Sequence, residues 1–81
     1  MINDKNWKDF TKLICLSFKE NMELKKFLNK AVEFQNNGMI EQVNSMQTEH
    51  EKLLLRNGIT SLKIAMASEK IQISQIDFNL N

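Results

Sequence analysis

The sequence predicts an all-α fold: a helical hairpin or a three-helix bundle with a long N-terminal helix, which we expect to be oligomeric. Three observations support this prediction. The 81 residues include no proline and only two glycines, apolar residues recur at helical spacing along most of the chain, and so short a chain has room for one core. We therefore expect residues 1–81 to form a single small helical domain, whose marginal core favours a partner or a second copy.

Residues 4–36 are expected to form the long first helix. Their apolar residues fall on one broad arc at about 100° per residue: Trp7, Phe10, Leu13, Ile14, Phe18, Leu24, Phe27, Leu28, Ala31, Val32 and Phe34. Ser17 and Glu20 interrupt this arc with the spacing of a capping box, so a break near residues 17–22 is the alternative. Because the stripe stays in phase on both sides of this point, we expect one continuous helix.

Residues 39–57 are expected to form the second helix, between Gly38 and Gly58. The segment follows i, i+3, i+4, i+7 spacing with Met39, Ile40, Val43, Met46, His50, Leu53 and Leu54. Glycine commonly ends helices in the left-handed conformation at the position after the last helical residue. Both glycines are therefore predicted to be helix stops.

Residues 60–80 are expected to form the third helix, with apolar residues on two faces. One stripe holds Leu62, Ala65, Met66, Ile73, Ile76 and Leu80, and the other holds Ile64, Ile71 and Phe78. Two apolar faces imply two neighbours, which could be the first two helices and a second chain. Residues 71–80 also alternate with period two, which is typical of an edge strand. We favour the helix because no second strand-like segment is present to pair with it.

Charge is distributed unevenly along the chain. The net charge is only +1, but residues 1–30 carry seven lysines, residues 31–51 carry four glutamates and no lysine or arginine, and the last thirty residues are basic again. An antiparallel hairpin would bring the acidic middle segment beside the basic first helix. This is a modest preference, because exposed ion pairs contribute about 0.2–1 kcal/mol each.

The sequence offers little that could carry chemistry. It contains no Gly-rich phosphate loop or calcium loop, so we expect no cofactor, no metal and no small-molecule substrate. His50 lies on an apolar stripe and is expected to be a half-buried core or interface residue. Cys15, at the edge of the apolar arc, is expected to act as a small buried hydrophobe. A catalytic Cys15–His50 pair would need further groups that the sequence does not supply, and we expect no enzyme.

The cellular setting is predicted from what the sequence does not contain. A single cysteine and no secretory signal pattern indicate a cytoplasmic protein, and the longest apolar runs are too short to span a membrane. Frequent Asn, Lys and Ile residues suggest an AT-rich coding sequence, of the kind found in phages, other mobile elements such as plasmids, and low-GC bacteria.

The function predicted is helix-mediated protein–protein binding by a small non-enzymatic regulator, inhibitor, assembly factor or chaperone. The candidate binding residues are apolar and lie in the first and third segments: Trp7, Phe10, Ile64, Ile71 and Phe78. The alternative is a nucleic-acid-binding regulator that contacts phosphates through a lysine stripe on the first helix: Lys8, Lys12, Lys19, Lys26 and Lys30.

A minor alternative comes from a resemblance. The length, a tryptophan near the start, the helix–loop–helix pattern and Leu55-Arg56-Asn57 before a third amphipathic stretch are similar to the needle subunits of type III secretion systems. The resemblance implies a needle-like assembly subunit. The proline-containing loop of that family is replaced here by Gln35-Asn36-Asn37-Gly38-Met39, so no functional residue is carried over.

Overall fold

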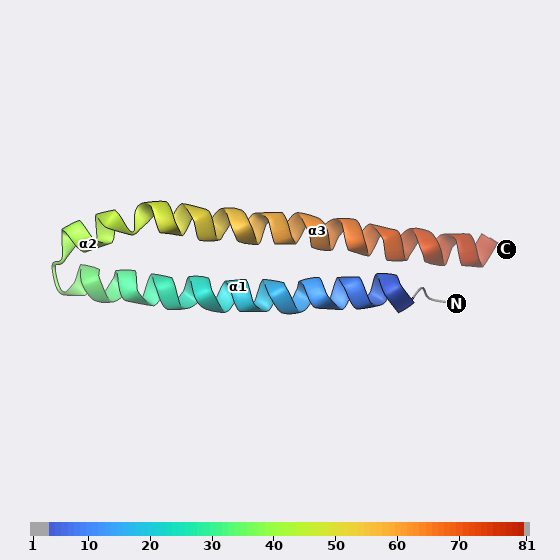
Figure 1. Cartoon of the computed structure of the whole chain (residues 1–81), viewed down its shortest axis with the longest axis horizontal. Helices are drawn as coiled ribbons and strands as arrows, with labels where there is room; N and C mark the ends of the chain where they lie inside the picture. Colours follow the sequence, from blue (N-terminus) through green and yellow to red (C-terminus); the bar gives the residue numbers. More distant parts are fainter. Residues whose placement is uncertain (1–3, 81) are drawn as a thin grey trace.

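The computed structural model describes the backbone of residues 4–80 and the side chains of residues 5–73. This part is all-helical, with α1 (Asp4–Asn36), α2 (Ile40–Ser45) and α3 (Gln47–Leu80) in chain order. α1 and α3 lie side by side and antiparallel, and the short α2 lies at the turn (Figure 1). The prediction of a helical hairpin is confirmed. The described residues form two long arms and not a three-helix bundle. The first arm is α1, and the second arm, which is bent, consists of α2 and α3.

α1 is one continuous helix of 33 residues, as the sequence predicted. The alternative of a break near residues 17–22 is wrong, and Ser17 and Glu20 both lie within the helix. Glu20 is buried against the second arm, with 6% of its surface exposed. The polar interruption of the apolar arc is therefore part of the contact between the arms and not a helix end.

Gly38 ends α1 in the predicted left-handed conformation, with φ of 72°. The backbone N–H of Gly38 donates to the carbonyl of Gln35 at 3.1 Å, and the N–H of Met39 donates to the carbonyl of Phe34 at 2.9 Å. These two bonds form the Schellman motif, which satisfies carbonyls at a helix C-terminus. The turn reverses the chain within a few residues and sends it back along α1.

The second arm is interrupted at Met46 and not at Gly58. The N–H of Met46 bonds to the carbonyl of Val43 at 3.1 Å, three residues back, which tightens the chain between α2 and α3. α3 then continues through Gly58 to Leu80. The predicted helix stop at Gly58 is wrong: its φ is not positive, and the residues that contact α1 stay in phase on both sides of it.

The side chains between the two arms follow a heptad pattern, with alternating steps of three and four residues. We call this row the seam. On α1 it contains Asn6, Phe10, Leu13, Ser17, Glu20, Leu24, Phe27, Ala31 and Phe34, and on the second arm Val43, Met46, His50, Leu53, Asn57, Thr60, Ile64, Ala67 and Ile71. All are half-buried or buried. This spacing is that of the a and d positions of a coiled coil.

Two contacts fix the register of the antiparallel arms. The rings of Phe27 and His50 stack with centroids 6.3 Å apart, and Arg56 Nη1 lies 3.5 Å from Glu23 Oε2. Each step along α1 is matched by an equal step back along α3. The register therefore places Glu20 at the level of Asn57, in the middle of the seam.

The second arm is longer than the first, so α3 extends past the start of α1 (Figure 1). Residues 71–80 are helical, which confirms the helix over the edge-strand alternative. Phe78, one of the predicted binding residues, lies outside the described side chains.

Candidate functional site

The predicted protein-binding residues do not gather on one surface. Phe10, Ile64 and Ile71 are half-buried in the seam, where they hold the arms together. Trp7 is 53% exposed and stacks on Phe10, with ring centroids 5.7 Å apart. Of the four predicted residues with described side chains, only Trp7 is available to a partner.

A second row of apolar side chains lies on α3, away from α1. We call it the outer stripe: Leu55, Ile59, Leu62, Met66 and Ile73, each between 46% and 68% exposed. Its steps of four, three, four and seven residues follow the heptad pattern of the seam, with Glu69 at the intervening position. Leu62, Met66 and Ile73 belong to a stripe predicted from the sequence. Leu55 and Ile59 were missed because the third helix was expected to start at residue 60.

The positions beside the seam differ in charge between the two sides of the hairpin. On one side, which we call the charged edge, lie Asp9, Leu16, Glu23, Lys30, Glu49, Arg56, Lys63 and Lys70. The Glu23–Arg56 pair bridges the arms on this side. On the other side, which we call the uncharged face, lie Trp7, Ile14, Asn21, Leu28, Gln47, Leu54, Ser61 and Ser68. Leu28 and Gln47 line a common groove there.

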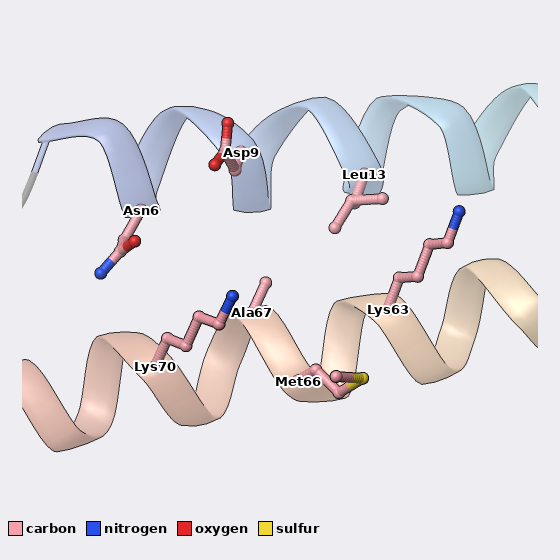
Figure 2. Close-up of a pocket in the computed structure, with 7 residues that line it drawn as sticks. All are labelled: Asn6, Asp9, Leu13, Lys63, Met66, Ala67 and Lys70. Carbon is pink, nitrogen blue, oxygen red and sulfur yellow. The ribbon is translucent and has the colours of Figure 1, made fainter.

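The charged edge contains a small groove between α1 and α3, shown in Figure 2. Leu13, Met66 and Ala67 supply its apolar lining, and Lys63 and Lys70 reach from α3 toward α1 (Figure 2). The volume is about 230 Å³, below the roughly 300–1,000 Å³ of small-molecule pockets. The groove is therefore a feature of the interhelical surface and a poor candidate for a substrate site.

The middle of the seam is polar. Thr60, only 3% exposed, donates its Oγ1 hydrogen to the carbonyl of Arg56 at 3.1 Å. Glu20 Oε1 and Asn57 Nδ2 are buried and have no hydrogen-bond partner among the described residues. An acceptor and a donor thus occupy the same level of the seam without being bonded. The sequence signal for this layer is a polar interruption in both heptad rows.

The lysines of the alternative nucleic-acid site are all exposed on α1: Lys8, Lys12, Lys19, Lys26 and Lys30. Lys8 and Lys30 are separated by about 33 Å along the helix axis, at 1.5 Å per residue. Lys12, Lys19 and Lys26 recur every seven residues and so lie along one line. The arrangement is a basic outer ridge.

Cys15 and His50 are far apart. His50 stacks on Phe27, which is twelve residues, or about 18 Å, from Cys15 along α1. Cys15 is exposed, so the expectation of a buried hydrophobe is wrong, whereas His50 is half-buried in the seam as expected. Within residues 5–73, no three side chains of His, Cys, Asp or Glu are placed to share a metal ion.

None of the described helices combines the length and the apolar character needed to cross a membrane. No protein-family model, curated protein or solved structure matches the chain. The functional assignment therefore depends on the residues themselves.

Proposed function

We propose that this protein is a non-enzymatic binding protein that engages a partner protein through the outer stripe of α3. The observation that carries the proposal is the exposure of this stripe along α3, on the side away from α1. Regulators, inhibitors, assembly factors and chaperones act by contacts of this kind. Contiguous apolar patches on a small protein commonly mark interaction sites.

The spacing of the outer stripe indicates the shape of its partner. Side chains at heptad spacing fit the matching row of another helix, because knobs and holes then repeat in step along both. An amphipathic helix laid along the stripe would cover about 27 Å between Leu55 and Ile73 at 1.5 Å per residue. Met66 lets the surface adapt, since its unbranched side chain fills irregular gaps.

Charge beside the stripe indicates the chemistry of that partner. Arg56, Lys63 and Lys70 run along one margin, and Gly58, Ala65 and Gln72 along the other. A row of basic residues favours acidic residues across an interface, through steering and through exclusion of like-charged competitors. The partner that fits is an amphipathic helix with acidic residues beside its apolar row.

The test is a triple substitution in the outer stripe, Leu55→Ser, Leu62→Ser and Met66→Ser. These side chains are exposed, so the hairpin should keep its helical circular dichroism. Proteins retained by the tagged wild-type chain would be identified, and the strongest binder purified and titrated. We expect its affinity to fall roughly 30-fold or more in the triple variant, since truncating even one hot-spot residue costs at least about 2 kcal/mol.

The matched control also tests the nucleic-acid alternative, which the exposure of the lysines in the basic outer ridge favours. The variant Lys8→Gln, Lys12→Gln, Lys19→Gln and Lys26→Gln leaves the outer stripe intact and should retain the protein partner. If the wild-type chain instead binds DNA or RNA with steep salt dependence and only the lysine variant loses binding, the nucleic-acid function replaces the one proposed.

A further inference from the structure

We propose that the uncharged face is the docking surface for a second copy of this chain, and that two hairpins form a four-helix bundle with its twofold axis parallel to the helices. This inference goes beyond the proposed function, which uses the outer stripe on a different side of α3. Four features of the hairpin support it: surface area, charge, the fit of large and small side chains, and one glycine.

The hairpin exposes more surface than a compact protein of its size. Its accessible surface is 6616 Å², whereas a compact monomer of 9.5 kDa exposes roughly 5,000 Å². The excess, about 1,600 Å² per hairpin, is roughly twice the 800 Å² or so that each partner buries in a standard protein interface, so it is large enough for a stable dimer. No apolar side chain within residues 5–73 is fully buried, so a second hairpin would complete a core that one hairpin leaves open.

On one side of the hairpin, an identical partner can pack without burying any ionised residue. The charged edge has ionised residues at seven of its eight positions, and the uncharged face has none at its eight. A face that meets its own copy must be self-complementary. Large side chains are exposed on and beside the uncharged face, including Phe18 at 65%, Val32 at 57% and Leu54 at 47%.

The register of the hairpin places large side chains of α1 level with small ones of α3. Trp7 lies at the level of Ser68, Ile14 at that of Ser61, and Phe18 at that of Gly58. Rotation about a twofold axis parallel to the helices keeps every residue at the same level along the rod. It places the uncharged faces of the two hairpins against each other, with the two turns at the same end. α1 of each copy then lies over α3 of the other at the same level, and each large side chain faces a small one.

Gly58 has no role within a single hairpin that requires glycine. Its φ is not in the left-handed region, and a Cβ added there would meet nothing within 4 Å. Glycine inside a helix weakens it relative to alanine. Close approach of another chain is a common reason for such a residue, and Phe18 of the second copy would fill this space.

Two charged residues at the margin of the uncharged face select the direction of the axis. The row next to the face contains Thr11, Phe18, Lys25 and Val32 on α1, and Asn44, Glu51, Gly58, Ala65 and Gln72 on the second arm. Lys25 and Glu51 carry opposite charges and lie at the same level. With the parallel axis, Lys25 of each copy faces Glu51 of the other, whereas an axis perpendicular to the helices reverses the levels and separates them.

The first measurement is the mass and length of the wild-type protein. Sedimentation equilibrium should give twice the 9.5 kDa of one chain. Small-angle X-ray scattering should show a rod whose long dimension stays near the 64 Å of one hairpin while its cross-section grows. A monomer at concentrations up to about 1 mM, or a dimer that is clearly longer than one hairpin, would overturn the proposal.

The second measurement is a charge exchange. Lys25→Glu and Glu51→Lys should each weaken dimerisation roughly tenfold, and the double variant Lys25→Glu with Glu51→Lys should restore it. Failure of the double variant to recover would overturn the parallel axis. Helical circular dichroism is recorded for each variant, because a change in charge on the surface should leave the hairpin folded.

The third measurement uses two substitutions with a matched control. Gly58→Ala should strengthen the helix and weaken the dimer, a combination that a purely local role for Gly58 does not produce. Gly58→Leu should abolish the dimer. Leu62→Ser, in the outer stripe, should leave the dissociation constant of the dimer unchanged; if it dissociates the dimer instead, the outer stripe is the dimer interface. A wild-type monomer, or Gly58 variants that dimerise normally, would leave the protein-binding function untouched, because that function is measured as partner affinity. Loss of the dimer in Leu62→Ser would instead place a second copy on the outer stripe.

Discussion

Glu20 and Asn57 show how single polar residues shape this hairpin. Both lie at the middle level of the seam, and Glu20 Oε1 and Asn57 Nδ2 are buried without hydrogen bonds. An unsatisfied buried polar group costs about 1–3 kcal/mol. A polar residue in a heptad seam also specifies register at a cost in stability, because slipping the arms would bury it against apolar layers such as Leu13 or Leu24.

We predict that the double variant Glu20→Leu with Asn57→Leu is more stable than the wild type by about 2 kcal/mol. Apolar residues would remove the unsatisfied atoms and extend the apolar layers on both sides. Chemical denaturation monitored by circular dichroism measures the change in the free energy of unfolding. The control is Glu33→Leu, the same substitution at an exposed site, which should change stability by less than about 0.5 kcal/mol. Equal or lower stability of the double variant would contradict the cost assigned to the polar layer.

His50 and Cys15, the two side chains best suited to catalysis or metal binding, illustrate what a sequence can predict about single residues. His50 lies on an apolar stripe, and its half-buried position in the seam follows from that pattern. Cys15 was expected to be buried because it adjoins the apolar arc, yet it is exposed. The seam is narrower than the arc, since only two positions in each heptad face the other arm. Cys15 falls outside these positions.

At the scale of the elements, the two glycines have the same neighbour, an asparagine before them, and different structural roles. Gly38 adopts φ of 72° and ends α1, whereas Gly58 continues α3. Glycine permits a left-handed conformation without requiring it. The seam residues decide the outcome: those beyond Gly58 contact α1 only if the helix continues, and this packing outweighs the cost of roughly 1 kcal/mol for a helical glycine.

We predict that Gly38→Ala destabilises the hairpin by about 1–2 kcal/mol, the cost of a left-handed conformation for a residue with a Cβ. Thermal denaturation at fixed protein concentration gives the change. Gly38→Asn is the control, and it should lose less because asparagine tolerates this conformation better. If Gly38→Ala matches the wild type, the turn does not depend on the left-handed residue.

The apolar residues of α1 follow a heptad repeat, and this repeat is hard to see when the residues are plotted at about 100° per residue. On an ideal helix of 3.6 residues per turn, a heptad row drifts by about 20° per repeat, so the seam spread into a broad arc along α1. The seam residues of α1 recur every three and four residues from Asn6 to Phe34. Ser17 and Glu20 lie in this row, and as polar residues they looked like an interruption.

The whole molecule is a thin rod of 64 × 15 × 14 Å, and its charges agree with the antiparallel arrangement. Along the charged edge, the register sets Asp9 level with Lys70 and Lys30 level with Glu49, on either side of the Glu23–Arg56 pair. The basic first helix beside the acidic start of the second arm was predicted from the sequence. Because Glu23 and Arg56 are both more than half exposed, this pair is worth about 0–1 kcal/mol and acts mainly on register.

We predict that the thermal midpoint of the wild-type protein rises by roughly 5–10 °C over a hundredfold increase in concentration. A dimer stabilises its folded state by mass action, and the unfolding entropy of a chain this short converts each kcal/mol into several degrees. Differential scanning calorimetry over that range provides the measurement. Lys25→Glu, which weakens the proposed dimer, should show a smaller concentration dependence. A constant midpoint for the wild type would show that one hairpin is stable alone.

The sequence by itself determined the helical class, the continuous first helix, the turn at Gly38 and the presence of two apolar faces on α3. These are local properties, set by helical periodicity, by the absence of proline and by the conformational freedom of glycine. Only the tertiary structure decided that α3 runs through Gly58, that Ile64 and Ile71 face α1 while Leu62 and Met66 face outward, and that the uncharged and charged positions lie on opposite sides. Each of these depends on the register of the two arms. Many weak contacts between residues far apart in the sequence set this register together, so neither arm alone predicts it.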